Sequence, residues 1–400
     1  MEMPQWKQQR DYCGGDVPSG PENILVERIT ESAFLGMGGE WNGLLERSAA
    51  NEVFLLWEWV RSWWSCFGGP DKSLFILTGR GPGGRLVGIA PFYVEKRKPI
   101  GLMERKILRL CSSVETGPDH LDFISDNGHA AAFAQAVFEF LSENGGEWDL
   151  MALSGLRQDS TIGGACLRAA PALAAQSIPG ELVPYLPLEG DFGRYMDCFS
   201  AKTRQTLRRK RKLLLKGTRL EILSGKTACQ DMRLKDLFVL HGARAERKGI
   251  RTAFAGERIY NFHTELIRSL EDSGKAVLAF LYQGTSPVAC FYCLEHNRKF
   301  YFYQTGISPE GEKMSAGTVL LSLLIERAFE HGCSEFDFLR GDEQYKFFWT
   351  KKCRRNYSLE VRKAGLAGAL SRHAHVVLRK LKDAARPVRQ AVGRFKPAWH

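Results

Sequence analysis

The sequence predicts an α/β protein of the α+β kind, made of two tandem halves that each contain a mixed, mostly antiparallel sheet flanked by helices. Three observations support this fold class. The chain has 400 residues, 44% hydrophobic and 25% charged, which is a globular composition and a length that one core rarely serves. Strand and helix patterns follow the same order in both halves: three strands, a helix and a further strand. No stretch of eighteen apolar residues occurs, so a membrane-spanning helix is not expected.

Residues 23–188 are expected to form the first half, after a disordered tail at 1–22 that is rich in glycine, proline and charge. An aromatic helix is predicted over 51–69, because its apolar residues recur at helical spacing before Gly68 and Gly69 end it. The other predicted elements of this half are two strands joined by a Gly/Pro turn at 73–97, strands at 120–124 and 147–156, a helix at 129–146, and a strand at 178–191 that joins the halves.

Residues 189–363 are expected to form the second half, followed by a basic tail at 364–400. A basic helix is predicted over 201–216, which lacks glycine and proline until Gly217. The helix predicted at 315–332 is apolar around most of its circumference, so most of it should be buried. The other predicted elements are helices at 231–248, 256–272 and 342–352, and strands at 275–282, 287–295, 299–307, 334–339 and 356–363.

The net charge of +11 is unevenly placed along the chain. Seven basic residues and no acid lie in 202–212, and ten basic residues with one acid lie in 362–400. Such blocks indicate an anionic partner: phosphate groups, nucleic acid or an anionic membrane surface. Arg204, Arg208 and Arg211 have helical spacing and are predicted to form one anion-binding face. The basic tail has two interpretations, a solvated or packed tail and an amphipathic helix on anionic lipid.

The ten cysteines are expected to be reduced, because the N-terminal region lacks the apolar core of a signal peptide and so favours a cytoplasmic protein. Cys290 and Cys293 form a CxxC motif inside an apolar run with strand propensity. No second CxxC and no pair of histidines at zinc-ligand spacing accompanies this motif. We therefore interpret both residues as core cysteines and expect no metal site.

The start of the buried helix is a candidate anion site. The helix start is expected beside a strand end in the middle of the sheet. This position follows from the predicted order of elements: three antiparallel strands, a turn into this helix, and then a strand parallel to the third strand. Free N–H groups and the positive end of the helix dipole bind phosphate at such a position. Ser315, Gly317 and Thr318 are small enough to let a pyrophosphate approach the backbone. The alternative is that Ser315 is an ordinary N-cap.

Four separated motifs carry a resemblance to a known family. They are "FLLWEWVRSWWSCFG", "LRLCSSVETGPDHLDFI", "SAKTRQTLRRKRKLLLKG" and a C-terminal stretch that runs from "YFYQTGISPEGEKMSAGTVL" to "NYSLEV". In this order, over roughly residues 24–362, they resemble the GNAT-type acyltransferases of the bacterial CelD/BcsL group, a family associated by name with cellulose biosynthesis. The resemblance implies two GNAT-like domains, akin to those of Fem-type peptidyl transferases, with acetyl-CoA or a longer acyl-CoA as the donor.

The resemblance also implies where the donor binds. In GNAT folds the third strand splays from the next strand, the pantetheine lies in the gap, and backbone amides of the following helix hold the pyrophosphate. By position, the gap would be lined by Gln304, Thr305 and Gly306, and the phosphates would be held by Met314, Ser315, Ala316, Gly317 and Thr318. The common phosphate loop, Gln/Arg-x-x-Gly-x-Gly/Ala, is replaced by "KMSAGT". This departure keeps aminoacyl-tRNA, the donor of Fem-type relatives, open as the alternative.

The stretch "FDFLRGDEQYKFFW", residues 336–349, is expected to form the far wall of this gap and a helix above the acyl group. Acyl transfer needs a base for the acceptor and a proton donor for the leaving thiolate. The candidates are Asp337 and Asp342 as base or acceptor-positioning groups, Tyr345 as proton donor to the thiolate, and Lys346 as a ligand of a phosphate or an acidic acceptor. The alternative is that Arg340, Asp342 and Lys346 form ion pairs that fix the turn.

Asp337 alternates with Phe336 and Phe338, so its side chain faces the opposite side of the strand. Because an unpaired buried carboxylate is costly, that side is expected to be the cleft or a paired polar site. The candidates for acceptor binding, some of them by resemblance, are Asp119, Asp122, His241, Arg247 and Arg340, whereas His120 is expected to be a surface histidine.

Three functions remain open from the sequence. The favoured one is an acyl-CoA-dependent N- or O-acyltransferase that acts on a sugar, amino sugar or small amine linked to envelope polysaccharide. The second is a Fem-like aminoacyl-tRNA-dependent peptidyl transferase, in which the basic helix binds tRNA. The third is a non-catalytic module that holds nucleic acid or a membrane. The favoured function implies a small-molecule or glycan-linked acceptor and a cytoplasmic location, with a peripheral position at the inner face of the membrane as its variant.

Overall fold

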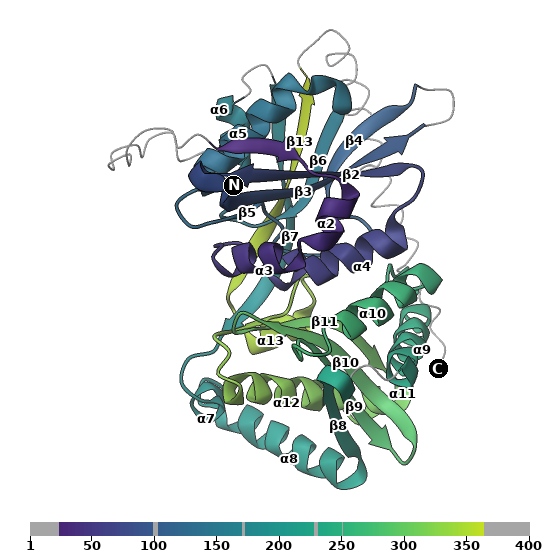
Figure 1. Ribbon diagram of the computed structural model, residues 1–400. Helices are drawn as coiled ribbons and strands as arrows, with labels where there is room; N and C mark the ends of the chain where they lie inside the picture. The colour runs from purple at the N-terminus through teal and green to yellow at the C-terminus, as the bar shows by residue number, and fades with distance from the viewer. Residues whose placement is uncertain (1–23, 99–102, 170–172, 228–230, 250, 364–400) are drawn as a thin grey trace, which may run out of the picture.

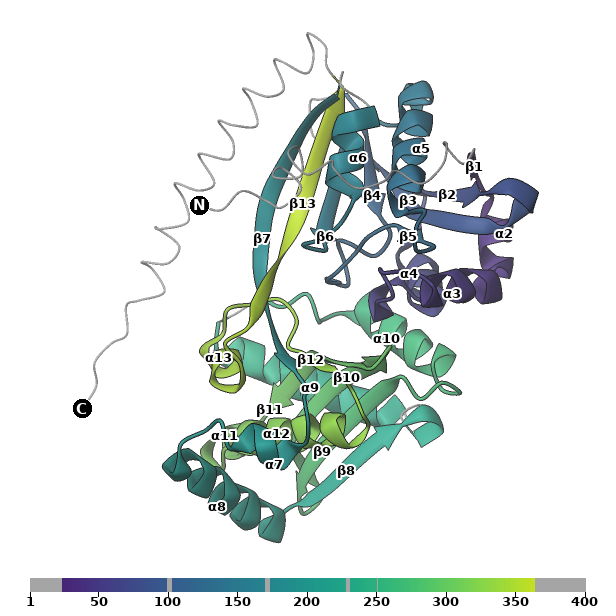
Figure 2. The same ribbon diagram turned by 90° about the vertical axis from the view of Figure 1, so that its left-hand side faces the viewer.

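The computed structural model describes residues 24–98, 103–169, 173–227, 231–249 and 251–363. The tails predicted at 1–22 and 364–400 lie outside these residues. Most of the described strands form one long mixed sheet that runs through the whole molecule (Figures 1 and 2). In order across the sheet they are β1 (Leu25–Arg28), β2 (Lys72–Arg80), β3 (Leu86–Arg97), β4 (Arg105–Leu110), β6 (Leu150–Leu156), β13 (Cys353–Lys363), β7 (Leu173–Pro187), β12 (Glu335–Asp337), β11 (Lys299–Ile307), β10 (Ser286–His296), β9 (Ala276–Gln283) and β8 (Arg219–Ser224), with β5 (Ile124–Ser125) paired to β3.

The pairing confirms the predicted fold class. Among the described strands, β4 with β6 and β11 with β12 are parallel pairs, and the other pairs of named strands are antiparallel. Each parallel pair has a helix in its connection, α5 (Ala130–Glu143) in the first half and α12 (Ala316–Glu330) in the second. The order of three strands, helix and strand is therefore present in both halves, as the sequence predicts.

The two halves exchange strands at the centre of the sheet. The last strand, β13, returns to the first half and lies between β6 and β7, with Val361 opposite Met151 and Leu359 opposite Ser177. Strand β7 in turn reaches the second half, where its Leu186 lies opposite Phe336 of β12. Figure 2 shows both strands running between the two halves. The domain boundary at 188 stays a prediction, and strand pairing crosses it in both directions.

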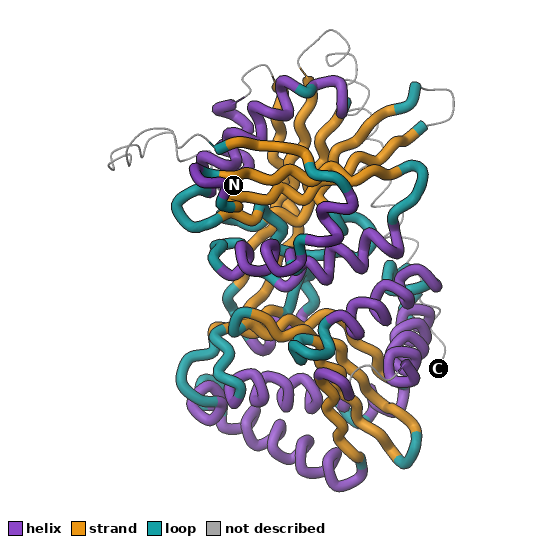
Figure 3. Tube along the Cα trace, viewed as in Figure 1, coloured by secondary structure: helices purple, strands orange, loops and turns teal. Residues whose placement is uncertain are grey.

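Helices cover both faces of the sheet (Figure 3). In the second half, Phe291 and Phe302 belong to a core with α12, whereas Tyr292 and Tyr303 pack with the core that holds α10, so the two helices lie on opposite faces. The described helices of four or more residues are α2 (Glu31–Gly36), α3 (Gly38–Glu46), α4 (Trp57–Phe67), α5, α6 (Ile162–Ala169), α7 (Phe192–Met196), α8 (Ala201–Gly217), α9 (Asp231–Arg247), α10 (Glu257–Ser269), α11 (Pro309–Lys313), α12 and α13 (Gln344–Trp349).

Aromatic packing joins the two halves. The ring of Trp59 on α4 lies 5.2 Å from that of Phe262 on α10 and 5.7 Å from that of Tyr303 on β11. All three side chains are buried or nearly so, which makes the tryptophan-rich segment part of the core between the halves. The helix predicted over 51–69 is shorter than expected, because residues Val53–Leu55 form a 3-10 turn and the α-helix begins at Trp57.

One predicted strand lies elsewhere. The third strand of the first half is β4, Arg105–Leu110, and not 120–124. Of that predicted strand, Ile124 alone pairs with β3, together with the next residue, Ser125. The segment "RKILRL" was missed because its basic residues Arg105, Lys106 and Arg109 interrupt the apolar pattern of a strand. Helix α6 and strands β1 and β8 were also not predicted.

Candidate functional site

Strand β11 leaves the sheet open on one edge. It pairs with β12 only over Lys299–Tyr301, whereas its pairing with β10 continues to Ile307. Among the described strands, none therefore pairs with the edge from Phe302 to Ile307 on the β12 side. Strand β12 is short because the chain turns away at Leu339, which has a φ of 56°, and at Gly341, which has a φ of 120°.

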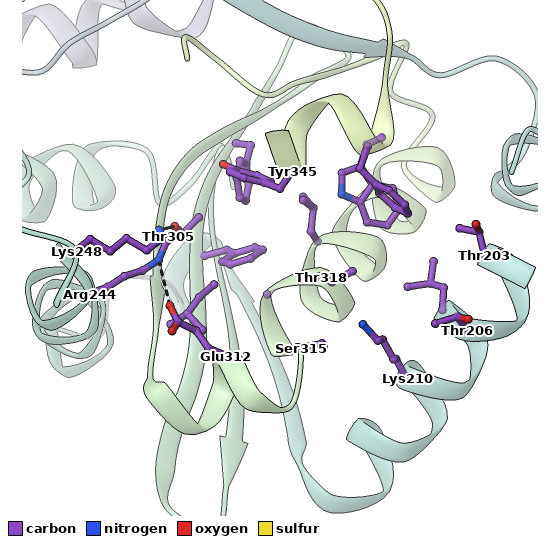
Figure 4. Close-up of a pocket in the computed structure, with 18 of the residues that line it drawn as sticks. Thr203, Thr206, Lys210, Arg244, Lys248, Thr305, Glu312, Ser315, Thr318 and Tyr345 are labelled. Carbon is purple, nitrogen blue, oxygen red and sulfur yellow. Dashed lines mark hydrogen bonds and ion pairs between the residues drawn. The ribbon is translucent and has the colours of Figure 1, made fainter. Parts of the chain in front are cut away.

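A cavity of about 780 Å³, which we call the first cavity, opens beside this edge between α8 and α12 (Figure 4). One part of its wall is polar and cationic, and the other part is apolar. The polar part consists of Lys202, Thr203, Thr206, Lys210, Arg244, Lys248, Thr305, Glu312, Ser315 and Thr318. The apolar part includes Leu207, Phe291, Phe302, Ile307, Leu321, Phe348 and Trp349, with Gly317 and Tyr345 completing the lining.

The start of α12 reaches this cavity without a side-chain cap. Ser315 has left-handed backbone angles, φ 58° and ψ 32°, and its hydroxyl makes no capping hydrogen bond, so the ordinary N-cap alternative is wrong. The free N–H groups of the first turn and the positive end of the helix dipole therefore lie at the cavity. A Cβ atom at Gly317 would lie 2.5 Å from Cδ1 of Ile307, so a larger residue there requires Ile307 to move.

The predicted donor residues divide into three groups. Thr305, Ser315, Gly317 and Thr318 line the first cavity, and Gln304 lines the cavity on the opposite face of β11. Gly306, Met314 and Ala316 line neither of the two: Gly306 packs against α9, where a Cβ would lie 2.6 Å from Cβ of Leu240, and Met314 and Ala316 pack into the core around α12.

A second cavity, of about 770 Å³, lies on the opposite face of β11 and reaches both halves. Its lining includes Asp119 and Thr116 from the first half, the side of α9 and α10, and the turn after β12. Phe302, Thr305 and Tyr345 line both cavities, as do Arg244 and Lys248. The open edge of β11 is thus the place where the two cavities meet.

Tyr345 stands at this meeting point. Its ring lies edge-on to that of Phe302, with 6.4 Å between the centroids, and 40% of the residue is exposed. Burial of the hydroxyl, with the nearby carboxylate of Glu343, raises the pKa of Tyr345 above its usual value near 10. The hydroxyl therefore carries its proton at neutral pH and can act as a hydrogen-bond donor.

The turn after β12 is held by ion pairs, as one interpretation of the sequence expects. Asp119 accepts hydrogen bonds from the backbone N–H of Arg340 (2.8 Å), from its Nε (2.7 Å) and from Nδ2 of Asn356 (2.6 Å). Lys346 is buried and donates to the carbonyl oxygens of Leu339 (3.2 Å) and Arg340 (2.6 Å), and it also pairs with a glutamate one turn away. Asp342 takes no part in this, because it is exposed and has no hydrogen bond or ion pair among the described residues.

Asp337 lies in a paired polar site and lines neither cavity. Its carboxylate is fully buried, accepts from Nε2 of His120 at 2.7 Å and forms an ion pair with Arg354. Burial alone would raise the pKa of Asp337, but the nearby His120 and Arg354 outweigh it and lower that pKa. Because Arg354 also pairs with Glu335, the cluster connects β12 and β13 with the 118–125 segment of the first half.

The expectation that His120 is a surface histidine is wrong. The residue is 3% exposed and has a φ of 58°. Burial opposes the imidazolium form, but the carboxylate of Asp337, at hydrogen-bond distance, outweighs it and raises the pKa of His120. Sequence alone gave no signal for this pair, because the two residues are 217 positions apart.

This ion pair predicts a pH dependence of stability. A histidine whose native pKa is raised contributes stability that is fully present below its unfolded pKa, near 6.5, and that is lost as the pH rises through the native pKa. We expect the difference in unfolding free energy between the wild type and His120→Gln to be larger at pH 6 than at pH 9. Urea unfolding followed by tryptophan fluorescence measures it. An equal difference at both pH values would contradict the charged pair.

The other predicted acceptor residues have different surroundings. His241 lines the second cavity and donates from Nδ1 to the carbonyl of Thr305 (2.8 Å), so its Nε2 accepts from the hydroxyl of Thr252 (2.8 Å). Burial lowers the pKa of His241, which keeps the ring neutral. Asp122 and Arg247 line neither cavity: burial raises the pKa of Asp122 to about 6, and Arg247 donates to the carbonyl of Ile307 (2.9 Å).

Helix α8 presents a different face to the first cavity from the predicted one. Arg204 donates to the carbonyl of Phe199 (2.8 Å), Arg211 pairs with Glu326, and Arg208 is exposed. The residues of this helix that line the cavity include two lysines and two threonines, none of which the sequence singled out: Lys202, Thr203, Thr206 and Lys210. Figure 4 shows Lys210 lying across the cavity from Ser315 and Thr318.

The first half does not repeat the open edge. There the segment that follows β4 lies beside β6, and Leu121 forms a parallel bridge with Leu156. The ring of Phe133, in the first turn of α5, packs on the sheet so closely that a Cβ at Gly88 would lie 2.3 Å from it. The space next to the helix start is therefore filled by protein in the first half.

The remaining sequence expectations concern the CxxC cysteines, metal sites and membrane-spanning helices. Cys290 and Cys293 are fully buried and not in disulfides, which confirms that they are core residues. Within the described segments, no group of three or more His, Cys, Asp or Glu side chains is arranged to hold a metal ion. None of the helices in the described part of the chain combines the length and the apolar character needed to cross a membrane.

Comparisons with known proteins agree with this geometry. Residues 201–347 match the family model of the acetyltransferase (GNAT) domain, a range that contains almost all of the first cavity. The comparison does not test the finer resemblance to the CelD/BcsL group, which stays a prediction. No curated protein sequence matches the chain.

Solved structures of the same fold cover most of the chain. The crystal structure of FemX is 13% identical, with a TM-score of 0.59, over 87% of this chain and 99% of FemX. A second structure, from Agrobacterium fabrum, is described as the C-terminal domain of a lysylphosphatidylglycerol synthetase. It is 13% identical, with a TM-score of 0.51, over 86% of this chain and 97% of that domain. At these identities the likeness shows a shared fold.

Proposed function

We propose that this protein is an acyl-CoA-dependent N- or O-acyltransferase that takes acetyl-CoA or a longer acyl-CoA as donor. One observation carries the proposal: the edge of β11 from Phe302 to Ile307, which none of the described strands pairs on the β12 side, lies beside the uncapped start of α12, and a large cavity opens there. An open strand edge offers backbone hydrogen bonds to an extended ligand, and a free helix start offers them to phosphate. The GNAT match over 201–347 supports the proposal.

In this proposal the two parts of the first cavity bind different parts of the donor. The phosphates of CoA lie at the N–H groups of Gly317 and Thr318, with the ammonium groups of Lys202 and Lys210 nearby. The pantetheine follows this edge of β11, where the carbonyl oxygens of Thr305 and Ile307 already accept from His241 and Arg247, and takes hydrogen bonds from the remaining backbone groups of the edge. The thioester then lies near Phe302 and Tyr345, where the second cavity meets the first.

The chemistry follows from this arrangement. The amine or hydroxyl of an acceptor in the second cavity attacks the thioester carbonyl, the carbon–sulfur bond breaks, and the acceptor loses a proton to solvent. Tyr345, which carries a proton at neutral pH, donates it to the departing thiolate and takes a proton back from solvent, so the site returns to its starting state. Asp337 and Asp342 receive no role as base, because neither lines a cavity.

Release of free CoA tests the function, and Tyr345→Phe tests the proton donor. Acetyl-CoA and longer acyl-CoAs are offered with a broad panel of amine and hydroxyl acceptors, and the released thiol is measured. We expect release with at least one pair, and a fall in kcat of about 10²-fold in Tyr345→Phe, with KM for the donor unchanged because the ring keeps its contact with Phe302. No release with any pair would overturn the function, and an unchanged kcat would remove Tyr345 from the chemistry.

A second candidate donor, aminoacyl-tRNA, is favoured by the outer surface of α8. Several exposed cations there have no ion-pair partner among the described residues: Arg208, Arg209, Lys212 and Lys216. Cations on one helix can follow a nucleic-acid backbone. The protein shares its fold with FemX, and the resemblance of its sequence motifs implies kinship with Fem-type transferases, for which aminoacyl-tRNA is the expected donor. A tRNA gel shift at low salt distinguishes the donors: retarded tRNA together with no CoA binding would replace acyl-CoA as the proposed donor.

The setting of the reaction is part of the proposal. The resemblance to the CelD/BcsL group motivates an acceptor in polysaccharide or envelope biosynthesis and a cytoplasmic protein. A peripheral contact with the membrane would involve the basic tail 364–400, which lies outside the described residues.

A further inference from the structure

The second cavity has more positive than negative charge available for a ligand. Four carboxylates line it, and each of them has a cationic partner within the protein. Asp119 and Glu181 face Arg340, Glu343 faces Lys346, and Glu115 pairs with Lys72. Some of the cations that line this cavity have no such carboxylate partner among the described residues.

Two of these cations lie where α9 ends. Lys248 and Arg251 line the cavity, are exposed, and have no ion-pair partner among the described residues. Arg244, one turn before Lys248, donates to Oγ1 of Thr305 at 3.2 Å and is 3.9 Å from its carboxylate partner, Glu312. This end of the cavity is therefore a cationic rim, made of Arg244, Lys248 and Arg251.

The opposite part of the wall contains a buried imidazole without a partner. His263 on α10 is 0% exposed, and neither of its ring nitrogens has a hydrogen-bond partner within the described part of the chain. Aromatic rings surround it, with centroids 5.0 Å away for Phe254, 5.3 Å for Tyr303 and 5.4 Å for Tyr292. Burial lowers the pKa of His263 to about 3, so the ring is neutral and offers one N–H donor and one acceptor nitrogen.

An unpaired buried polar group costs stability, so a site that keeps one has either a water molecule or a ligand group to satisfy it. The hydroxyl of Tyr292 and Nε1 of Trp59 are buried and lack partners among the described residues as well. Of these three groups, His263 is the one that lines the second cavity, and its unpaired nitrogens indicate a polar atom that the protein itself does not supply.

We propose that the second cavity selects an acceptor that carries an anionic group, a carboxylate or a phosphate, besides its amine or hydroxyl. The anionic group lies at the rim of Arg244, Lys248 and Arg251, the body of the acceptor lies against Phe254 and Tyr303, and a polar group of the acceptor hydrogen-bonds His263. This inference rests on the proposed function, since it names the class of acceptor for the same reaction.

The test uses matched pairs of amines that differ by one anionic group, without any acyl donor. The probes are glucosamine with glucosamine 6-phosphate, and tyramine with tyrosine. Isothermal titration calorimetry at low salt compares their affinities for the full-length protein. We expect the anionic member of at least one pair to bind at least tenfold more tightly than the neutral member. The phosphate pair and the carboxylate pair separate the two kinds of anion.

Two double variants locate the anion site. Lys248→Gln with Arg251→Gln should remove the preference for the anionic probe. Lys235→Gln with Arg105→Gln removes the same charge from exposed positions that line neither cavity, so the preference should remain. Equal affinities within both pairs, no binding of any probe, or a preference that survives the first double variant would each overturn the inference.

His263→Phe separates binding from a structural role. Phenylalanine keeps the packing of the ring and removes the unpaired nitrogens, so we expect the melting temperature to stay equal or rise while affinity for the anionic probe falls about fivefold. A lower melting temperature with unchanged affinity would show that His263 has a structural role and would overturn its proposed hydrogen bond to the acceptor. The binding experiment contains no acyl donor, so its result is independent of the proposed function. Tight binding of an anionic probe would support the anion site even if no acyl transfer is found. Acyl transfer to neutral acceptors alone would support the proposed function and refute this inference.

Discussion

Replacing Gly317 with aspartate is expected to abolish the stabilisation that the proposed ligand CoA should give the protein, about 2.7 kcal/mol when the ligand is at a hundred times its Kd. The added carboxylate would stand at the second residue of α12, where it takes the place of the CoA phosphates at the helix start and repels them. Its Cβ would also lie 2.5 Å from Cδ1 of Ile307, so the cavity wall has to move. The fold itself should persist, because acidic residues are favourable in the first turn of a helix.

Gly39→Asp is the matched control for this variant. Gly39 is the second residue of α3 and is exposed, and a Cβ atom added there would have no other atom within 4 Å. The same substitution is therefore made in the same helical position, away from the cavity. Chemical denaturation with and without CoA measures both proteins. If Gly317→Asp were stabilised by CoA as strongly as Gly39→Asp, the donor site would have to lie elsewhere.

Asp337→Asn is expected to lower the free energy of unfolding by about 3–5 kcal/mol, because it leaves the buried His120 and the half-buried Arg354 without their common carboxylate. The sequence made Asp337 a candidate base, but the structure places it among charges that join the two halves. The variant should therefore fail mainly through stability. Urea unfolding at neutral pH gives the free energy, and activity is compared at a temperature where both proteins are folded.

Asp342→Asn provides the comparison. Asp342 lies in the same turn, is exposed, and has no ion pair among the described residues, so its change should be within about 0.5 kcal/mol. A stable Asp337→Asn protein that has lost acyl transfer would contradict the structural role and return Asp337 to the chemistry. Loss of acyl transfer in stable Asp342→Asn would do the same for Asp342.

The sequence was sufficient for elements whose pattern is local. The apolar helix α12 and the strands β9, β10 and β11 were predicted because hydrophobic periodicity and turn residues are read over a few positions. The parallel pairing of β11 with β12 followed from the order of elements. Strand β4 was missed because its basic residues mask the apolar pattern, and the exchange of β7 and β13 has no local signature, since it is a property of the assembled sheet.

The candidate site shows the same division. The helix start at Ser315 and Gly317 could be found from small residues before an apolar helix. The sequence could not show that Lys202 and Lys210 line the cavity while Arg204 and Arg211 do not, because this depends on which side of α8 faces the cavity. In the sequence, nothing separates His263 from the other residues on the apolar face of its helix. Its unpaired ring nitrogens in the folded protein distinguish it from them.

The most direct test of the central claim is a crystal structure of the protein grown with saturating CoA. The account predicts the pyrophosphate within hydrogen-bond distance of the first N–H groups of α12 and the pantetheine along the edge of β11 from Phe302 to Ile307. CoA bound at a site away from this edge, or crystals that exclude CoA while tRNA binds α8 in solution, would contradict it.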